Sequence, residues 1–450
     1  MCVNTGALSH WNNSTMKNVQ WVCRAKQTML AVAGSLFVVL GASTALSQMY
    51  FPPVQDTTWE TVSRAELGWC DEHLDSLYRY LADNATRGFI VLKDGRIAIE
   101  WYPDTVTRTN FWYWASAGKS LTATLVGIAE KEGYLNINDA SNKYLGEGWT
   151  NMTAEQENKV TIWHHLTMTS GIDDNSADMY CTQPTCFQYR TEPGTRWSYN
   201  TAVYTMLDGV IKDATGRNIN EYLNTKIKSV TGMDGMYIKS GDNNVMYSTP
   251  RSMARFGLLA LNGFRWNGGD PLLEDEYAHN MVNTSQQLNL SYGYLWWLNG
   301  KSSFMIPGLQ IKFPGSLSVS EPPDAYNGLG KNDQIVSVVP SMGMVVVRMG
   351  DDASPSKPEV ATVLLEGIWK RLRAVMCSTT SVSEHAEPDT WWSALPNNTS
   401  ISVYDVMGRI VSRYATIDAM PLDVRSRCRV QCTNDLDTQS AQTVNVLALY

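Results

Sequence analysis

Two pairs of apolar, alternating segments constrain the fold more than any other feature of the sequence. The first pair spans Phe89 to Tyr102 and is divided by Lys93-Asp94-Gly95. Asp-Gly between such runs predicts a β-hairpin. The second pair spans Gln334 to Met349 and turns at Pro340–Gly343. Because the chain between the two pairs is largely helical in pattern, the sequence predicts an α+β fold in which helices pack on an antiparallel sheet.

Four segments have the apolar spacing of amphipathic helices. They are residues 116–131, 201–214, 250–262 and 357–376. Gly133 is expected to end the first helix, since glycine is the usual residue just beyond a helix C-terminus.

The first 47 residues differ from the rest of the chain. Lys17, Arg24 and Lys26 precede an apolar stretch from Met29 to Leu46, and the first fifty residues contain no Asp or Glu. Basic residues before an apolar segment are typical of a secretory signal peptide and of a membrane anchor, and both interpretations remain open.

Changes in composition divide the chain into four parts. The export segment is followed by a short linker, a large main domain, and a region rich in Ser, Thr and Asn that is either a tail or a small β appendage. Their expected bounds are 1–47 for the signal or anchor, 48–64 for the linker, 65–376 for the main domain and 377–450 for the C-terminal region.

Six cysteines lie beyond the apolar stretch, and an even number after an export signal predicts disulfides, although buried free thiols are an alternative. Cys181 and Cys186 are close enough to close a local loop. Six Asn-x-Ser/Thr sequons also lie beyond the apolar stretch, and a secretory host can glycosylate them. They are at Asn84, Asn151, Asn283, Asn289, Asn397 and Asn398. We therefore expect a secreted or membrane-anchored protein whose main domain lies outside the cytoplasm.

The charge balance excludes some functions. The formal net charge is −8 and no cluster of Lys and Arg occurs, so we expect no nucleic-acid partner. None of the six histidines lies in a zinc-binding pattern, so we expect no metal. A hydrophobic content of 44% is sufficient for a large globular core.

A Ser-x-x-Lys motif at Ser116 and Lys119 is the main candidate for chemistry. A serine hydroxyl is a weak nucleophile and needs a base within hydrogen-bond reach, and this spacing places both side chains on one face of a helix. A lysine can be that base if burial lowers its pKa. The motif is short and occurs three times, and Ser116 is also a reasonable helix cap. The three copies are Ser14/Lys17, Ser116/Lys119 and Ser354/Lys357.

Four segments, of which the first contains Ser116 and Lys119, resemble motifs of the β-lactamase-related serine hydrolases. This superfamily includes class C β-lactamases, DD-peptidases and family VIII-type esterases. The four segments are Ser116-Ala117-Gly118-Lys119-Ser120, Val160 to Gly171, Pro193 to Thr201 and Tyr326 to Gln334. Their order and spacing also fit, and the resemblance covers roughly residues 65 to 376. Tyr199-Asn200-Thr201 is most similar to the branch of 6-aminohexanoate-dimer hydrolases and related carboxylesterases.

The resemblance implies a β-lactamase/transpeptidase-like fold, with a mostly helical subdomain beside the sheet. It also implies that Ser116 attacks a carbonyl carbon to form an acyl-enzyme, while Lys119 and Tyr199 act as general base and acid. The backbone N–H of Ser116 and one from the strand beginning near Gln334 would form the oxyanion hole. Such a mechanism uses no metal and no organic cofactor. For Tyr199, packing in the core is the alternative role.

Lys331, Asn332 and Gln334 are the candidate substrate-binding residues, because they stand where the resemblance places a third motif; alternatively, they begin an edge strand. In family β-lactamases and DD-peptidases this motif reads Lys-Thr/Ser-Gly or His-x-Gly, whereas here it reads Lys331-Asn332-Asp333. The departure disfavours β-lactams and D-Ala carboxylates, and it favours a small-molecule ester, amide or peptide substrate. Nearby tryptophans either line an apolar acyl pocket or fill the core. They are Trp114, Trp197, Trp296 and Trp297.

Two other functions are compatible with the sequence, because a fold does not fix a function. One is a catalytically silent binding or scaffold protein on the same fold, and the other is a peptidoglycan-type DD-peptidase or β-lactamase. The presence of Ser116, Lys119 and Tyr199 together favours a hydrolase, since a scaffold has no physical need for all three. The sequence leaves the oligomeric state open.

Overall fold

A computed structural model describes most of the main domain and several short segments beyond it. The described residues are 49–175, 178–353, 361–377, 400–404, 410–414, 419, 428–431 and 443–448. The expected signal or anchor at 1–47 and the beginning of the helix expected at 357–376 lie outside them. Among the helices that the structure describes, none is both long and apolar enough to cross a membrane.

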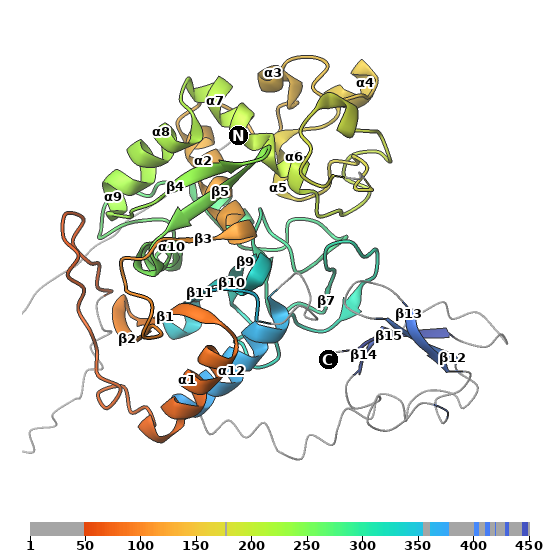
Figure 1. Cartoon of the computed structure of the whole chain (residues 1–450). Helices are drawn as coiled ribbons and strands as arrows, with labels where there is room; N and C mark the ends of the chain where they lie inside the picture. Colours follow the sequence, from red (N-terminus) through yellow and green to blue (C-terminus); the bar gives the residue numbers. More distant parts are fainter. Residues whose placement is uncertain are drawn as a thin grey trace, which may run out of the picture. The chain divides into compact units, whose positions relative to one another are not determined.

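A six-stranded antiparallel sheet is the framework of the main domain, with strand order β2-β1-β11-β10-β9-β6 (Figure 1). Its strands are β1 (Thr86–Lys93), β2 (Arg96–Trp101), β6 (Trp297–Leu298), β9 (Tyr326–Gly330), β10 (Gln334–Val339) and β11 (Met344–Gly350). The two segment pairs that the sequence predicted as strands become neighbours here, because β1 pairs with β11. The predicted α+β fold with an antiparallel sheet is therefore confirmed.

The hairpin between β1 and β2 turns at Asp94 and Gly95, as the sequence predicted. Both residues have positive φ angles, 48° for Asp94 and 83° for Gly95. Two central residues with positive φ match the right-handed twist of the flanking strands, and Asp-Gly adopts them readily.

Helices cover both faces of the sheet (Figure 1). Helix α10 (Pro250–Leu261) lies on one face, where a Cβ added to Gly257 would come 2.4 Å from a methyl group of Val345 in β11. Helices α1 (Leu74–Asp83) and α12 (Thr362–Val375) pack against each other on the other face. The close approach of α10 to the sheet requires a residue without a side chain at 257.

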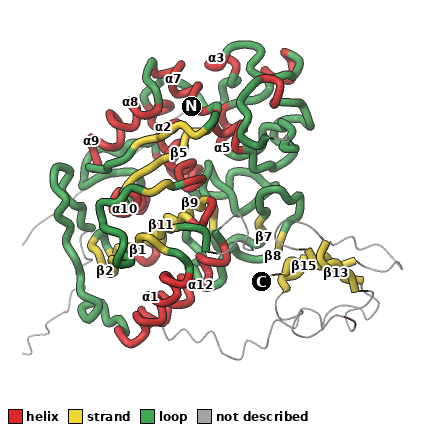
Figure 2. The backbone as a smooth tube through the Cα atoms, viewed as in Figure 1, coloured by secondary structure: helices red, strands yellow, loops and turns green. Residues whose placement is uncertain are grey.

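A mostly helical subdomain is built around α2 (Gly118–Lys131), whose residues from Gly118 to Ala129 are all buried. A helix buried on every side is a central helix rather than a surface one. The surrounding helices are α3 (Asn142–Leu145), α4 (Ala154–Asn158), α5 (Ile162–Leu166), α6 (Thr201–Thr205), α7 (Leu207–Thr215), α8 (Ile219–Leu223), α9 (Ser229–Thr231) and α11 (Asp275–Met281). Long loops connect them (Figure 2).

Two small sheets complete the main domain. The first has the order β3-β5-β4 and consists of β3 (Trp112–Tyr113), β4 (Met236–Ser240) and β5 (Asn243–Ser248). The second pairs β7 (Ser303–Phe304) with β8 (Phe313–Pro314). Strand β3 leads directly into the segment that carries Ser116.

The segment that we expected to be a linker makes regular contacts with the hairpin of β1 and β2. The backbone N–H of Tyr50 donates to the carbonyl of Asp94 at 3.0 Å, and the N–H of Val62 donates to the carbonyl of Ile97 at 3.0 Å. The indole of Trp59 is buried and donates to the carbonyl of Gly95 at 2.7 Å. Residues 50–62 are therefore part of the packed structure.

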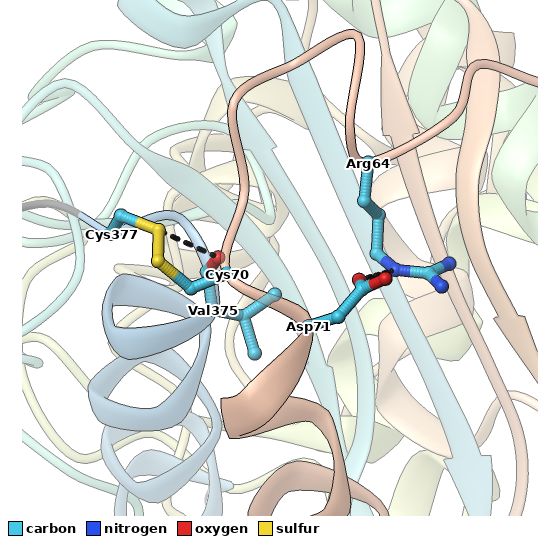
Figure 3. Close-up of a disulfide and its surroundings, with 5 residues drawn as sticks. All are labelled: Arg64, Cys70, Asp71, Val375 and Cys377. Carbon is cyan, nitrogen blue, oxygen red and sulfur yellow. Dashed lines mark hydrogen bonds and ion pairs between the residues drawn. A yellow bond between two sulfur atoms is a disulfide. The ribbon is translucent and has the colours of Figure 1, made fainter.

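Among the residues that the structure describes, two disulfides are present, as the cysteine pattern predicted. One joins Cys70, just before α1, to Cys377, just after α12, with the two Cα atoms 5.5 Å apart (Figure 3). The backbone N–H of Cys70 also donates to the carbonyl of Val375 at 2.7 Å. The other joins Cys181 to Cys186 and closes the expected local loop.

The C-terminal region contains a four-stranded sheet with the order β13-β12-β15-β14. Its strands are β12 (Ser400–Tyr404), β13 (Ile410–Tyr414), β14 (Cys428–Gln431) and β15 (Thr443–Ala448). Strands β12 and β15 run parallel, and the other two pairs are antiparallel.

Candidate active site

Ser116 lies in a short 3₁₀ turn, Ala115–Ala117, that runs directly into α2. The preceding residue, Ala115, has a φ of 45°. This left-handed conformation is unfavourable for alanine, and backbone strain of this kind is common at functional sites. Because the chain continues as a helix, Lys119 follows one turn later on the same face as Ser116.

The side chains of Ser116 and Lys119 are in hydrogen-bond contact. The distance from Lys119 Nζ to Ser116 Oγ is 3.0 Å, and Lys119 is only 3% exposed. Burial lowers the pKa of Lys119 from 10.5 to about 7, because the ammonium form loses its hydration. Within the part of the chain that the structure describes, no carboxylate lies within ion-pair distance of it. A neutral amine beside Ser116 is thus accessible near pH 7.

The structure brings Tyr199 to the same place. Its ring centroid lies 5.2 Å from Lys119 Nζ, and its ring stacks on that of Trp297 with centroids 5.8 Å apart. Tyr199 stands just before α6, which begins where the side chain of Asn200 accepts a hydrogen bond from the N–H of Val203 at 3.1 Å. The three residues that the sequence singled out for catalysis therefore lie together.

Thr201 is a further member of this cluster that the sequence reading did not single out. Its Oγ1 lies 3.4 Å from Lys119 Nζ. Its position in the Tyr199-Asn200-Thr201 segment was the available signal, since a residue two positions after the tyrosine returns to the same side of the chain.

The end of β9 packs against the serine turn. A Cβ added to Gly330 would lie 3.0 Å from the backbone nitrogen of Ser116 and 2.9 Å from that of Ala117. The residue adjacent to Ser116 thus ends β9 and precedes the turn that leads to β10. The expectation that the strand beginning near Gln334 supplies an oxyanion-hole N–H stays a prediction. The turn of Lys331–Asp333 separates the two strands.

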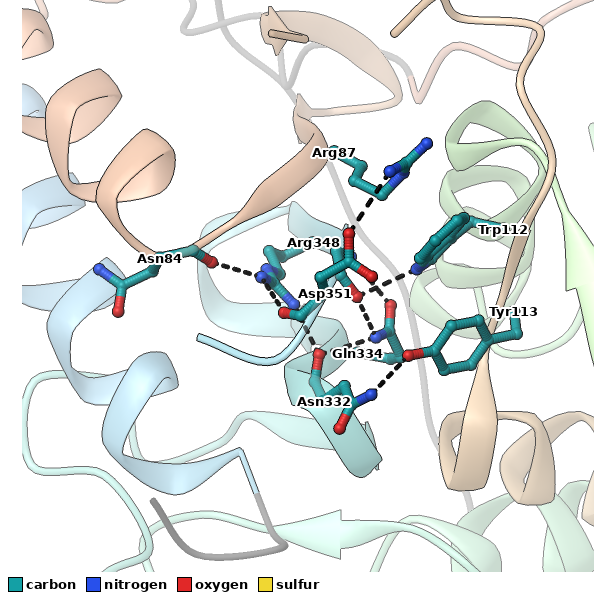
Figure 4. Close-up of polar contacts among 9 residues, drawn as sticks. Asn84, Arg87, Trp112, Tyr113, Asn332, Gln334, Arg348 and Asp351 are labelled. Carbon is teal, nitrogen blue, oxygen red and sulfur yellow. Dashed lines mark hydrogen bonds and ion pairs between the residues drawn. The ribbon is translucent and has the colours of Figure 1, made fainter. Parts of the chain in front are cut away.

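Gln334 is buried and its side-chain amide holds this turn (Figure 4). Its Nε2 donates to the carbonyls of Asn332 at 2.7 Å and Gly350 at 2.6 Å, and its Oε1 accepts from the N–H of Gly350 at 3.0 Å. With both ends of its amide bonded to backbone, Gln334 has a structural role here, and the expectation that it contacts substrate is not supported by its placement.

Asn332 and Lys331 are placed differently from Gln334. Asn332 has a φ of 58°, and its side-chain amide donates to the hydroxyl of Tyr113 at 2.7 Å (Figure 4). This bond links the turn to β3, three residues before Ser116. Lys331 is exposed. Lys331 is therefore accessible and Asn332 partly so, and the substrate-binding role expected for both stays a prediction.

Arg348 is fully buried beneath the same turn. Its guanidinium donates to four backbone carbonyls, and burial lowers its pKa to about 10. The carbonyls belong to Asn332 at 2.7 Å, Asp333 at 3.0 Å, Asn84 at 2.6 Å and Asp351 at 3.0 Å (Figure 4). Arg348 thus ties the turn to the start of β1. Sequence reading missed it, because its partners come from distant segments.

The tryptophans near the motifs fill the core. All four are buried, and Trp114 donates to Ser248 Oγ at 2.7 Å. They are Trp114, Trp197, Trp296 and Trp297. Of the two interpretations that the sequence allowed for them, their burial supports core packing, and a role in lining an apolar acyl pocket stays a prediction.

Comparison with known families agrees with this geometry. A family model described as Beta-lactamase matches residues 79–366. The chain belongs to the Beta-lactamase family. No curated protein matches it significantly.

Solved structures of other proteins share the fold at low sequence identity. A Bacillus anthracis protein provisionally described as a 6-aminohexanoate-dimer hydrolase is 18% identical, with a TM-score of 0.53, covering 72% of this chain and 89% of that one. A provisionally described beta-lactamase from Bacteroides dorei DSM 17855 is 15% identical, with a TM-score of 0.55, covering 69% and 99%. The predicted β-lactamase/transpeptidase-like fold is therefore confirmed.

Proposed function

We propose that this Beta-lactamase family member is a serine hydrolase that cleaves an ester or amide bond through an acyl-enzyme on Ser116. The observation that carries the proposal is the 3.0 Å contact between Ser116 Oγ and the buried Nζ of Lys119. A serine needs a base at this distance. Because burial lowers the pKa of Lys119 to about 7, its amine can be neutral at that pH and accept the serine proton.

In the acylation step, Ser116 Oγ attacks the carbonyl carbon of the substrate while its proton passes to Lys119 Nζ. The oxygen of the tetrahedral intermediate takes up negative charge, which backbone N–H groups at the start of α2 and the end of β9 would stabilise. Collapse breaks the ester or amide bond. The departing alkoxide or amine takes a proton from the Lys119–Tyr199 pair.

In the deacylation step, a water molecule attacks the acyl-enzyme. The same pair accepts the proton of the water and returns one to Ser116 Oγ, which releases the acid and restores the enzyme. The place of Tyr199 beside Lys119 and the packing of its ring on Trp297 support this proposed role. Thr201, also beside Lys119, is suited to orient the amine.

We propose a small-molecule ester, amide or peptide substrate rather than a β-lactam. The turn after β9 carries Lys331-Asn332-Asp333 in place of Lys-Thr-Gly, and it is anchored by Gln334 and Arg348. The Bacillus anthracis relative, provisionally described as a 6-aminohexanoate-dimer hydrolase, fits this choice by its name alone. The two disulfides fit a protein that folds in an oxidising compartment, so we place the enzyme outside the cytoplasm, secreted or membrane-anchored.

The test is intact-mass analysis of the purified protein after incubation with a fluorophosphonate, which reacts with activated serines. We expect one adduct on the wild type and none on Ser116→Ala. Ser354→Ala is the matched control, because Ser354 belongs to another Ser-x-x-Lys copy, and it should label like the wild type. Absence of an adduct on the folded wild type would instead favour a catalytically silent binding protein on this fold.

A further inference from the structure

The amine of Lys119 lies over the face of a buried tyrosine that the proposed mechanism does not use. Its Nζ is 4.4 Å from the ring centroid of Tyr204, closer than the 5.2 Å that separates it from the ring of Tyr199. Tyr204 is 4% exposed. The negative face of an aromatic ring attracts a cation, and the attraction is stronger where water is excluded.

The ring of Tyr204 is held in this orientation by the helix that carries Lys119. Its hydroxyl lies 2.9 Å from Oγ1 of Thr122, which follows Lys119 by three residues on α2. Thr122 Oγ1 is also 2.9 Å from the hydroxyl of Tyr237, and that hydroxyl donates to the carbonyl of Gly118 at 3.2 Å. Because residues three apart share a helix face, the fixed ring and the amine lie in register.

We propose that Tyr204 is a positioning residue that sets the proton affinity of Lys119 by presenting its ring face to the ammonium group. This inference rests on the proposed function. Burial favours the neutral amine, whereas the ring favours the ammonium form, and in the part of the chain that the structure describes no carboxylate offsets the charge. The balance keeps Lys119 able both to accept a proton from Ser116 and to return one.

Other titratable groups lie near this cluster and must be distinguished from Lys119. Tyr199 precedes α6, Tyr237 is on β4, and Asp208 is on α7. Asp208 accepts a hydrogen bond from the amide of Asn244, and burial raises its pKa to about 7. Its carboxylate acts electrostatically on Tyr204 and Tyr237. An Asp208→Asn variant therefore separates its titration from that of Lys119.

The test replaces Tyr204 first by Phe and then by phenylalanines with one, three or five ring fluorines, introduced into the full chain by amber suppression. Fluorine withdraws the negative charge of the ring face with little change in size. The rate of fluorophosphonate labelling of Ser116 is measured from pH 5 to 9, and it should fall as Lys119 becomes protonated at low pH. We expect this midpoint to stay near the wild-type value in Tyr204→Phe.

Across the fluorinated series the midpoint should move to lower pH in steps, by about 0.4 to 1.5 units in total, which matches the usual strength of a cation–π contact. The pKa of Lys119 itself, followed by NMR in protein labelled at lysine Cε with Lys119→Met as the assignment control, should move in parallel. A uniform loss of rate with a constant midpoint would mean that Tyr204 serves packing alone, and it would overturn the inference.

Two further outcomes separate the inference from the proposed function. A wild type that fails to label, while the NMR midpoint still falls with fluorination, would refute the hydrolase and leave the role of Tyr204 intact. A wild type that labels, with an NMR midpoint unaffected by fluorination, would refute the role of Tyr204 alone. In Asp208→Asn the fluorine trend should persist; its disappearance would assign the midpoint to Asp208 and overturn the inference.

Discussion

Gly330, the last residue of β9, packs directly against the backbone nitrogen of Ser116. A Cβ at this position would lie 3.0 Å from that nitrogen and 2.5 Å from the carbonyl oxygen of Trp114. The contact with the carbonyl oxygen is shorter than a Cβ tolerates and the contact with the nitrogen is unusually tight, and both partners are backbone atoms that cannot swing aside. The absence of a side chain at 330 therefore allows the strand edge and the serine turn to meet.

Gly330→Ala should reduce turnover by about 10²-fold or more, because the strand edge and the serine turn must move apart and an oxyanion-hole donor shifts with them. Steady-state kinetics with an activated ester, together with circular dichroism, would measure this. Gly209→Ala is the control, because a Cβ there meets only the end of the flexible Leu145 side chain. Near-normal turnover in Gly330→Ala would mean that this contact does not shape the site.

Tyr199→Phe should reduce turnover by about 10²–10⁴-fold, which is the usual contribution of a general acid or base. The melting temperature should change little, because the ring still stacks on Trp297. The matched control is Tyr292→Phe, which removes a hydroxyl from a neighbouring ring whose centroid is 6.2 Å from that of Tyr199. If Tyr199→Phe and Tyr292→Phe have equally small effects, proton transfer must be assigned to another group.

Much of the fold was predictable because its signals are local. The Asp94-Gly95 turn, the spacing of α2 and the pairing of Ser116 with Lys119 each depend on residues within a few positions of one another. The helix expected at 201–214 was only partly right, since it is divided at Met206 into α6 and α7. Apolar spacing continues across such a break, so it cannot reveal it.

The parts of the site that could not be predicted depend on contacts between distant segments. Gln334 was interpreted as a substrate ligand from its position in a motif, yet its amide is bonded to Gly350 across the sheet. Arg348 and Tyr204 gave no signal at all, because a buried arginine in a strand and a tyrosine in a short helix acquire their roles only from tertiary neighbours. Sequence spacing identifies side chains that lie on the same helix or strand. It does not identify the residues from distant segments that hold those side chains in place.

Arg348→Met should destabilise the domain by at least about 3 kcal/mol. The change leaves several buried carbonyls without a donor, and each unsatisfied group costs about 1–3 kcal/mol. Arg348→Lys should rescue little, since one ammonium cannot reach carbonyls on both sides of β11. Urea unfolding would give both values, with the exposed Arg79→Met as a control expected within about 0.5 kcal/mol of the wild type. A loss below about 1 kcal/mol for Arg348→Met would contradict the anchoring role.

Lys119→Met should abolish turnover and yet stabilise the fold at neutral pH. Burial lowers the pKa of Lys119 to about 7 in the folded protein, against 10.5 for an exposed lysine. Between these values the unfolded chain binds more protons than the folded one, so the free energy of unfolding of the wild type rises with pH. At pH 7 the wild type therefore carries nearly the full cost of the buried amine, and a methionine of similar volume removes it.

Whether Lys119→Met is more or less stable than the wild type, and how the difference changes with pH, can be measured directly. Urea unfolding of both proteins at pH 7, 8, 9 and 10 should show Lys119→Met as the more stable at pH 7. Its advantage should shrink as the pH rises toward 10, by up to about 1.4 kcal/mol per pH unit. Lys143→Met is the control, since Lys143 is exposed and paired with Asp139, and its difference from the wild type should vary little over this range. A constant or growing difference for Lys119→Met would show that Lys119 is charged in the folded protein at neutral pH, and it would then be unable to act as the base for Ser116.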